Sequence, residues 1–288
     1  MSWTITARPD AIPASRVEAR WLVQALQEAR EISAAASLPL AVGRVRVPLQ
    51  ALANIEKSIN SSGAIRFIGD FSRWDGLGFG MKSGHLIVVG HAGARTAAEL
   101  AGGIVEIRGI SGPWAGAAIS GGRLVVHGDT GDWLGANWPG DLRGMTGGEI
   151  FVHGRAGHHV GVRMRRGVIA VAGPVGEGVG RGMIAGSILL ASSTQGNVGQ
   201  GMKRGTIVIG PGADCRTAIS ATGFTEADDF RPHTLGIQLR YAAESGWKPA
   251  EGMLRALSVT RFVGDRLLQG LGEVFVLSDS AKGATAKS

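Results

Sequence analysis

Cysteine is almost absent from this sequence, since Cys215 is the only one among 288 residues. One cysteine excludes an internal disulfide framework and a cysteine-based metal cage, and it is typical of a protein from a reducing cytoplasm. No apolar run reaches 18 residues, so we expect no membrane-spanning helix. The N-terminal MSWTITARPDAIPASR lacks the apolar core of a signal peptide. These shortages together predict a cytoplasmic protein.

Charged residues are also few, at 18%, but hydrophobic residues make up 44%, which excludes wholesale disorder. Lysine and arginine number 30 and aspartate and glutamate 23, so the formal net charge is +7. This balance favours an anionic partner surface and does not by itself indicate nucleic acid. Glycine is in excess: 47 residues, about 16% against an average near 7%. The glycines lack the three-residue period of collagen, so a different repeat must explain them.

That repeat follows the template G-x-[ILV]-x-[VIFL]-x-G. Copies start at Gly63, Gly84, Gly103, Gly122, Gly148, Gly167, Gly186 and Gly205. The intervals are 21, 19, 19, 26, 19, 19 and 19 residues, and the longest contains an insertion around ANWPGDL, residues 136–142. A fixed period near 20 residues is typical of a stacked repeat architecture.

Each copy reads as a short strand with alternating side chains. The second and fourth positions after the glycine are apolar in every copy, so we expect them to face a common core. Methionines at a shared repeat position should fill the same core: Met81, Met145, Met164, Met183 and Met202. The predicted fold is all-β: a single-stranded right-handed β-helix, a solenoid of about eight coils with a 19-residue repeat and flanking N- and C-terminal cap segments.

The third position of each strand points outward but is mostly apolar. This stripe comprises Ile87, Val125, Phe151, Leu189 and Val208. An apolar outer surface implies a cover, supplied either by the flanking segments of the chain or by a partner subunit. We interpret the stripe as partner-facing.

The flanks lack the repeat, which gives four expected segments. Residues 1–62 form an N-terminal extension with an amphipathic helix, starting at a Ser15/Glu18 capping box and presenting Val17, Trp21, Leu22 and Leu26 on one face. Residues 63–211 form the glycine repeat. Residues 212–278 form a C-terminal cap or docking arm with strand-like LGIQLRY (235–241) and EVFVL (273–277), and residues 279–288 form a disordered tail.

Groups able to perform chemistry are scattered. His127 and His153 occupy the same outward position of consecutive strands and are expected to stack, but no third metal ligand is evident. The His158–His159 pair fits a solvated turn better than a catalytic pair, and the aspartates lie at glycine-rich corners, where aspartate caps turns. We therefore predict no catalytic residue and no bound metal.

Basic residues recur at the corners of the repeat. Lys82, Arg165 and Lys203 share one position, and Arg166 and Arg204 share the next; Arg163 lies nearby. The pairs 165–166 and 203–204 are two repeats apart, roughly 10 Å in a stacked array. These residues are either solvated turn residues or a positive edge for an anionic ligand or an acidic subunit.

The stretch from Trp114 to Gly210 carries a resemblance. GDTGDWLGANWPGDLRGMTGGEIFVHGRAGHHVG, followed by MRRG, GMIAGSI and GMKRGTIVI, resembles the C-type subunit of the formylmethanofuran dehydrogenase family. The repeat alone is also similar to the C-terminal glycine-repeat domain of the glutamate synthase large subunit. The insertion WPGDLRGM and the late VGDRLLQGLGEVFVL favour the former. The similarity covers most of residues 63–278.

This resemblance implies a role in one-carbon metabolism. Archaeal relatives belong to a tungsten or molybdenum formylmethanofuran dehydrogenase, and relatives in methylotrophic bacteria to a formyltransferase/hydrolase complex. That complex passes a formyl group from a tetrahydromethanopterin carrier, through a methanofuran-type carrier, to formate. Heavy use of alanine, glycine and arginine favours the bacterial complex.

In that family the metal site and the formyl transfer belong to other subunits, described as hydrolase, dehydrogenase-like and formyltransferase subunits. The resemblance thus implies a non-catalytic structural subunit with no cofactor of its own, in a complex that uses a methanofuran-type carrier. If the basic edge is functional, it either steers that anionic carrier or meets an acidic subunit. Two alternatives remain: a glutamate-synthase-like spacer module, and an independent β-helix enzyme, for which the clustered carboxylates or open catalytic histidine are missing.

Overall fold

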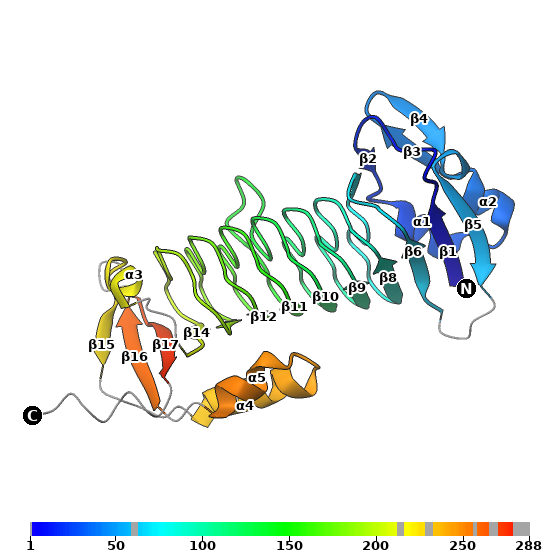
Figure 1. The fold of residues 1–288 in the computed structure, drawn as a ribbon. Helices are drawn as coiled ribbons and strands as arrows, with labels where there is room; N and C mark the ends of the chain where they lie inside the picture. The colour runs from blue at the N-terminus through cyan, green and yellow to red at the C-terminus, as the bar shows by residue number, and fades with distance from the viewer. Residues whose placement is uncertain are drawn as a thin grey trace, which may run out of the picture.

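The computed structural model describes residues 2–58, 63–211, 216–227, 233–255, 258–264 and 270–278. The molecule is elongated: a regular series of short parallel strands connects an N-terminal unit at one end with a C-terminal unit at the other (Figure 1). No helix in the described ranges is long and apolar enough to cross a membrane.

The parallel strands fall on the copies of the sequence repeat. They are β6 (Ile65–Ile68), β8 (His85–Val89), β9 (Ile104–Ile107), β10 (Arg123–Val126), β11 (Glu149–Val152), β12 (Val168–Val171), β13 (Ser187–Leu190) and β14 (Thr206–Ile209). Each pairs in register with the next, as in Leu124 with Ile150 and Ile150 with Ile169. A second line of parallel bridges joins the loops, from Phe71 to Thr194.

Alternating side chains of these strands form the main core. The second and fourth positions are fully buried from β8 to β14, as predicted, and so are the five repeat methionines. Burying one such aliphatic side chain stabilises the fold by about 1.5–3 kcal/mol. Because the same burial recurs in each repeat, burial of these apolar side chains is the largest stabilising contribution to the fold.

Close backbone approach explains why glycine recurs. Gly90 has φ +142°, and a Cβ built there would lie 1.9 Å from the carbonyl oxygen of Gly69 in the preceding repeat. No larger residue fits unless the two backbones separate.

The N-terminal unit adds two strands to the long sheet and also contains a second sheet and two short helices. β1 (Ser2–Ala7) pairs in parallel with β6 and antiparallel with β5 (Ala53–Ser58), so both strands extend the long sheet. A second sheet has the order β4-β3-β2-β7. The remaining elements are β2 (Val17–Glu18), α1 (Leu22–Glu28), α2 (Ile32–Ala36), β3 (Pro39–Val42), β4 (Val45–Pro48), the 3-10 turn η1 (Leu49–Ala51) and β7 (Trp74–Asp75).

The predicted amphipathic helix is present but begins later than expected. α1 buries Leu22, Val23 and Leu26, and its N-cap is Trp21. The prediction of a capping box at Ser15 is wrong, because Val17 and Glu18 form strand β2, which pairs with β3 and β7. Tertiary pairing overrides the local helix-start signal there.

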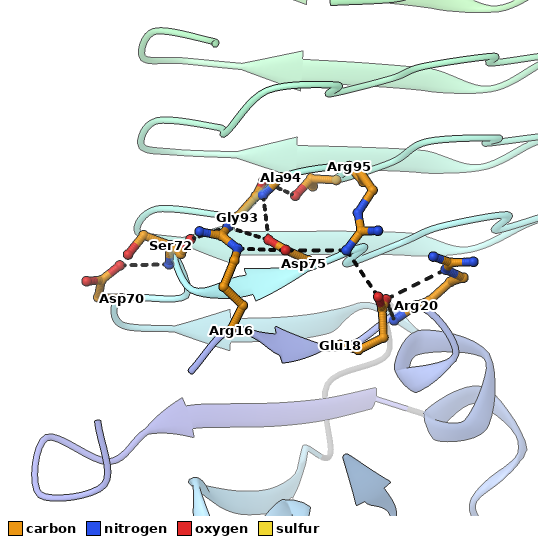
Figure 2. Close-up of polar contacts among 10 residues, drawn as sticks. Arg16, Glu18, Arg20, Asp70, Ser72, Asp75, Gly93, Ala94 and Arg95 are labelled. Atoms are coloured by element: carbon orange, nitrogen blue, oxygen red, sulfur yellow. Dashed lines mark hydrogen bonds and ion pairs between the residues drawn. The ribbon is translucent and has the colours of Figure 1, made fainter. Parts of the chain in front are cut away.

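A polar network fastens this unit to the first repeats (Figure 2). The buried Asp75 carboxylate accepts hydrogen bonds from Arg16 Nε at 2.7 Å and from the Ala94 amide at 2.9 Å, and pairs with Arg95 at 3.3 Å. Arg95 also pairs with Glu18 at 3.1 Å. The hydrogen bond to Asp75 raises the pKa of Arg16. Three segments distant in sequence are therefore joined at one carboxylate.

The C-terminal unit closes the other end and covers one sheet face. β17 (Gly272–Ser278) pairs in parallel with β14, and then β16 (Ser258–Gly264) and β15 (Thr225–Ala227) add antiparallel strands. The helices are α3 (Arg216–Ser220), α4 (His233–Glu244) and α5 (Pro249–Arg255). α4 and α5 lie along the sheet (Figure 1).

The strand expected at 273–277 is confirmed as β17, whereas the strand expected at 235–241 is wrong. Leu235, Leu239 and Ala242 share a helical face that packs on the sheet. LGIQLRY satisfies both the two-residue and the helical period, so the surrounding packing decides. Cys215 and the predicted tail 279–288 lie outside the described residues.

The fold class predicted from the repeat is wrong for this chain. Among the described residues, the repeat strands belong to a 13-stranded mixed sheet of order β15-β16-β17-β14-β13-β12-β11-β10-β9-β8-β6-β1-β5, accompanied by a second, four-stranded sheet and by helices. This is not a single-stranded right-handed β-helix with simple caps. The flanks lack the 19-residue repeat, yet their strands pair with the open edges of the ladder and become part of the same sheet.

Candidate functional site

One corner of the repeat carries bulky residues in a conformation that normally favours glycine. Arg95, Trp114, Trp133 and His159 occupy equivalent places in successive repeats, and their φ angles lie between +59° and +65°. Each main-chain amide donates to the following repeat, as in Trp114 N to Asp132 O at 2.8 Å. Left-handed non-glycine residues cost on the order of 1 kcal/mol each and gather at functional sites. The backbone strain therefore indicates that the side chains at this corner are candidate functional groups.

Those rings stack. Trp114 and Trp133 are parallel within 2°, with centroids 5.0 Å apart, and Trp138 lies on Trp114 at 5.4 Å. His159 continues the row beside Trp133 at 4.2 Å. Trp138 comes from the insertion and is fixed by a hydrogen bond from its Nε1 to Glu99 at 2.9 Å. The insertion thus adds a ring to a row built by the repeat.

A cleft of about 880 Å³ opens beside this row, and we call it the cationic cleft. The insertion forms one side of it, and turns before β12, β13 and β14 form the other. Its lining residues are Trp114, Trp133, Asn137, Pro139, Leu142, Val162, Arg163, Arg165, Arg181, Gly182, Ile184, Gln200, Gly201 and Lys203. None of these is acidic, so the cleft combines aromatic edges with concentrated positive charge.

Four cations of the cleft are uncompensated. Within the described residues, Arg163, Arg165, Arg181 and Lys203 form no ion pair. Arg165 N bonds Met145 O, and Lys203 N bonds Met183 O, each at 2.8 Å, so the two side chains leave equivalent turns. Stacking at about 4.8 Å per strand places them roughly 10 Å apart. Such a row attracts a ligand with several negative charges.

Only three of the six residues predicted to form the basic edge line the cationic cleft. Arg163, Arg165 and Lys203 line it, whereas Arg166 and Arg204 are exposed residues outside its lining, and Lys82 lies near the N-terminal end of the array. Arg181 was missed, because in earlier repeats its position holds small residues. The tryptophans and Asn137 were also missed as site residues, although the irregular 26-residue interval was a signal for the three that lie in it, Trp133, Asn137 and Trp138.

Two buried polar atoms at the cleft have no hydrogen-bond partner among the described residues. Asn137 donates both amide hydrogens to main-chain carbonyls, of Trp138 at 2.8 Å and Asp141 at 2.7 Å, so its Oδ1 is left unpaired. Arg165 Nε is buried without an acceptor as well. Unpaired buried polar atoms are uncommon in folded proteins and call for an explanation.

The apolar stripe is covered by the chain itself over most of its length. Phe151, Leu189 and Val208 are buried under a cluster from α4, α5 and β17. The partner-facing interpretation is therefore wrong for these three residues, since the C-terminal helices supply the cover. Val125 packs at the border of the cluster, and Ile87 is buried between Arg66 and Glu106 on the neighbouring strands.

Polar contacts fix these helices at the rim of that cluster. Trp247 Nε1 donates to Val152 O at 3.3 Å, and Arg123 bonds Glu149 at 2.7 Å and Ser245 at 3.3 Å. Tyr241 donates a hydrogen bond to Glu149. The helices are therefore anchored to β10 and β11.

The histidines His127 and His153 stack with centroids 5.1 Å apart, as predicted. His127 also lies 3.3 Å from Glu106. Burial, and then the neighbouring His127 and Lys248, lower the pKa of His153. Over the described part of the chain, no group of three or more His, Cys, Asp or Glu side chains is arranged to hold a metal ion.

Comparison with known proteins identifies a structural relative. No protein-family model and no curated protein matches the chain. The chain is similar to a chain in the crystal structure of the formyltransferase/hydrolase complex (FhcABCD) from Methylorubrum extorquens in complex with methylofuran. The two are 26% identical, with a TM-score of 0.81, over 95% of this chain and 99% of that chain. The predicted resemblance to this complex is confirmed; the assignment to its C-type subunit stays a prediction.

Proposed function

We propose that this chain is a subunit of a formyltransferase/hydrolase complex of one-carbon metabolism, that it has no catalytic centre of its own, and that its cationic cleft binds an anionic, methanofuran-type carrier. The similarity supports this, because it spans nearly the whole of both chains and the relative was crystallised with methylofuran. The partners would be the hydrolase, dehydrogenase-like and formyltransferase subunits, in the cytoplasm.

In this proposal the complex converts the formyl group of formyl-tetrahydromethanopterin, through the carrier, to formate. Bond breaking takes place in the partner subunits. This chain holds them in place and keeps the carrier nearby. Methanofuran-type carriers bear glutamyl groups, and several carboxylates on one ligand match a row of cations better than one carboxylate does.

The observation that carries the proposal is the uncompensated charge of the cleft. Arg163, Arg165, Arg181 and Lys203 converge on a space with no acidic lining residue. Like charges held together destabilise the free protein unless an anionic ligand neutralises them.

The test replaces these four residues with glutamine in the intact complex. The apparent KM for the carrier should rise at least about tenfold at low ionic strength, with little change in kcat, because uniform binding is lost. Added salt should reduce the difference. Matched replacement of the exposed Arg166 and Arg204 with glutamine should have a smaller effect. An unchanged KM at low salt for the four-residue variant contradicts carrier binding in the cleft.

Membership and the absence of catalysis need separate tests. The chain tagged in its native cell should co-purify with the other subunits, as identified by mass spectrometry. The purified chain alone should release no formate from formyl-tetrahydromethanopterin in the presence of carrier. Turnover by the isolated chain would show that the non-catalytic role is wrong.

A further inference from the structure

The linker between α4 and α5, residues 245–248, attaches the two helices to the end of β11. The fully buried Trp247 donates a hydrogen bond from Nε1 to the Val152 carbonyl at 3.3 Å. The next residue after Val152 is His153, and the next after Trp247 is the exposed Lys248. A titratable ring and a cation therefore lie at the point where the helical cover is attached.

His153 lies where a positive charge is not compensated. Its ring is half-buried and stacks on His127 of β10, with centroids 5.1 Å apart and planes within 9° of each other. Burial, and then the charges of His127 and Lys248, lower the pKa of His153. The equivalent residue after β12 is the neutral Ala172. Within the described part of the chain, histidines form ion pairs at His85 and His127 but not at His153.

The stacked partner of His153 has a different environment. His127 Nε2 lies 3.3 Å from Glu106, and the same carboxylate pairs with Arg108 at 3.1 Å. A proton on His127 therefore has a carboxylate partner, whereas a proton on His153 meets His127 on one side and Lys248 on the other. The two rings are alike in geometry, but only the inner one is destabilised by its own protonation.

We propose that His153 is a pH-sensitive switch for the helical cover: its protonation favours a state in which the linker between α4 and α5 lifts from β11. Lifting moves Lys248 away and gives the imidazolium access to water, so the lifted state binds the proton more tightly than the closed state. By linkage, the closed state is fully favoured above about pH 6.5 and loses population as pH falls below that value. Lifting uncovers part of the apolar stripe at Phe151 and Leu189. This inference does not rest on the proposed function, because it uses only contacts within the chain.

The switch changes a population and does not detach the helices completely. Leu235, Leu239 and Trp247 remain apolar anchors at every pH. One proton that binds only to the lifted state increases the population of that state about tenfold at one pH unit below 6.5. Because the closed state keeps some affinity for the proton, we expect an increase of about threefold to tenfold.

The experiment is hydrogen exchange on the full-length chain at about pH 7.5 and about pH 5.5, with rates corrected for the intrinsic effect of pH on exchange. Low ionic strength is used, because salt screens an exposed lysine. Protection of the α4 and α5 amides should fall about threefold to tenfold at the lower pH, with a smaller fall in β8 and β9. Unchanged protection of α4 and α5 overturns the switch. A fall as large in β8 and β9 also overturns it, since that result indicates general destabilisation by acid.

Three variants assign the effect to His153. H153Q removes the titratable ring and should show equal protection of α4 and α5 at both pH values. K248M removes the facing charge, keeps the length of the side chain, and should show a smaller fall than the wild-type chain. H85Q is the control, because His85 also pairs with Glu106 but lies on β8, three strands from β11, and it should keep the wild-type fall.

The quantity compared is the ratio of protection at the two pH values within each variant. A substitution that loosens the helices at both pH values therefore does not hide the answer. A wild-type fall that persists in H153Q overturns the role of His153, and one that persists in K248M overturns the role of the facing cation. Loss of the fall in H85Q means that the pH response belongs to the sheet face around Glu106, and this result overturns the switch as well.

Discussion

Replacing Asp75 with alanine removes the carboxylate that joins the N-terminal unit to the first repeats. The variant leaves the Ala94 amide without its acceptor and removes one of the two carboxylates paired with Arg95, and hydrogen bonds to a charged group contribute about 1.5–3 kcal/mol each. Arg16 is 56% exposed, so its ion pair is screened and adds at most about 1 kcal/mol. Arg95 keeps its contact with Glu18, which offsets part of the loss. We expect the free energy of unfolding to fall by about 2–4 kcal/mol.

Urea unfolding of the full-length chain, followed by circular dichroism, measures this loss, and hydrogen exchange locates it. In a repeat array each unit contacts only its neighbours, so faster exchange should be confined to the N-terminal unit and the first repeats, with β13 and β14 unchanged. The control is D129A, which removes one hydrogen bond, from the Arg155 amide at 2.7 Å, and no ion pair that the described residues form. It should cost about 1 kcal/mol. Equal losses in the two variants, or exchange that rises uniformly along the array, would refute this account of Asp75.

Three further predictions concern pH, backbone approach and the C-terminal helices. Burial lowers the pKa of His153 in the folded chain, so as pH falls below about 6.5 the unfolded chain takes up this proton before the folded chain does. The free energy of unfolding should therefore decrease as pH falls through this range. H153Q should make that decrease smaller in a series of urea midpoints measured against pH. G90A should prevent folding or lower the free energy of unfolding by more than about 3 kcal/mol in thermal melts, because its Cβ would lie 1.9 Å from a backbone oxygen. G140A is the control: its Cβ has nothing within 4 Å, so it should cost only about 1 kcal/mol. Similar melting curves for the two variants would contradict the close-approach argument. W247A should cost about 3–5 kcal/mol and expose α4 and α5 to limited proteolysis, and unchanged cleavage would mean that these helices are not anchored through this indole.

Contacts between residues at equivalent positions of neighbouring repeats could be predicted from the sequence. Gly84 and Gly103 mark equivalent points, and pairing in register brings residues 19 apart in sequence to neighbouring strands. The alternation of buried positions, the methionine core and the His127–His153 stack all follow from that translation. The strand at 273–277 was also predictable, since it is a short run of β-branched and aromatic apolar residues, Val274 to Leu277, preceded by glycines.

Features that depend on segments outside the repeat were not predictable. LGIQLRY became a helix because Leu235, Leu239 and Ala242 gain burial on the sheet in that form, and the same helices closed the stripe at Phe151 and Leu189. Strands from both flanks turned the ladder into a mixed sheet. Local sequence is neutral between such alternatives, and the packing of distant surfaces decides among them.

The cationic cleft lies between these two cases. The sequence alone determined that Arg165 and Lys203 leave equivalent turns, because the repeat period is a property of the chain. Only the tertiary structure brought Trp114, Asn137 and Lys203 to one space, since an insertion has no period and its direction depends on what it packs against. Repetition thus specifies neighbours one period apart, and contacts across several periods arise only when the whole chain has folded.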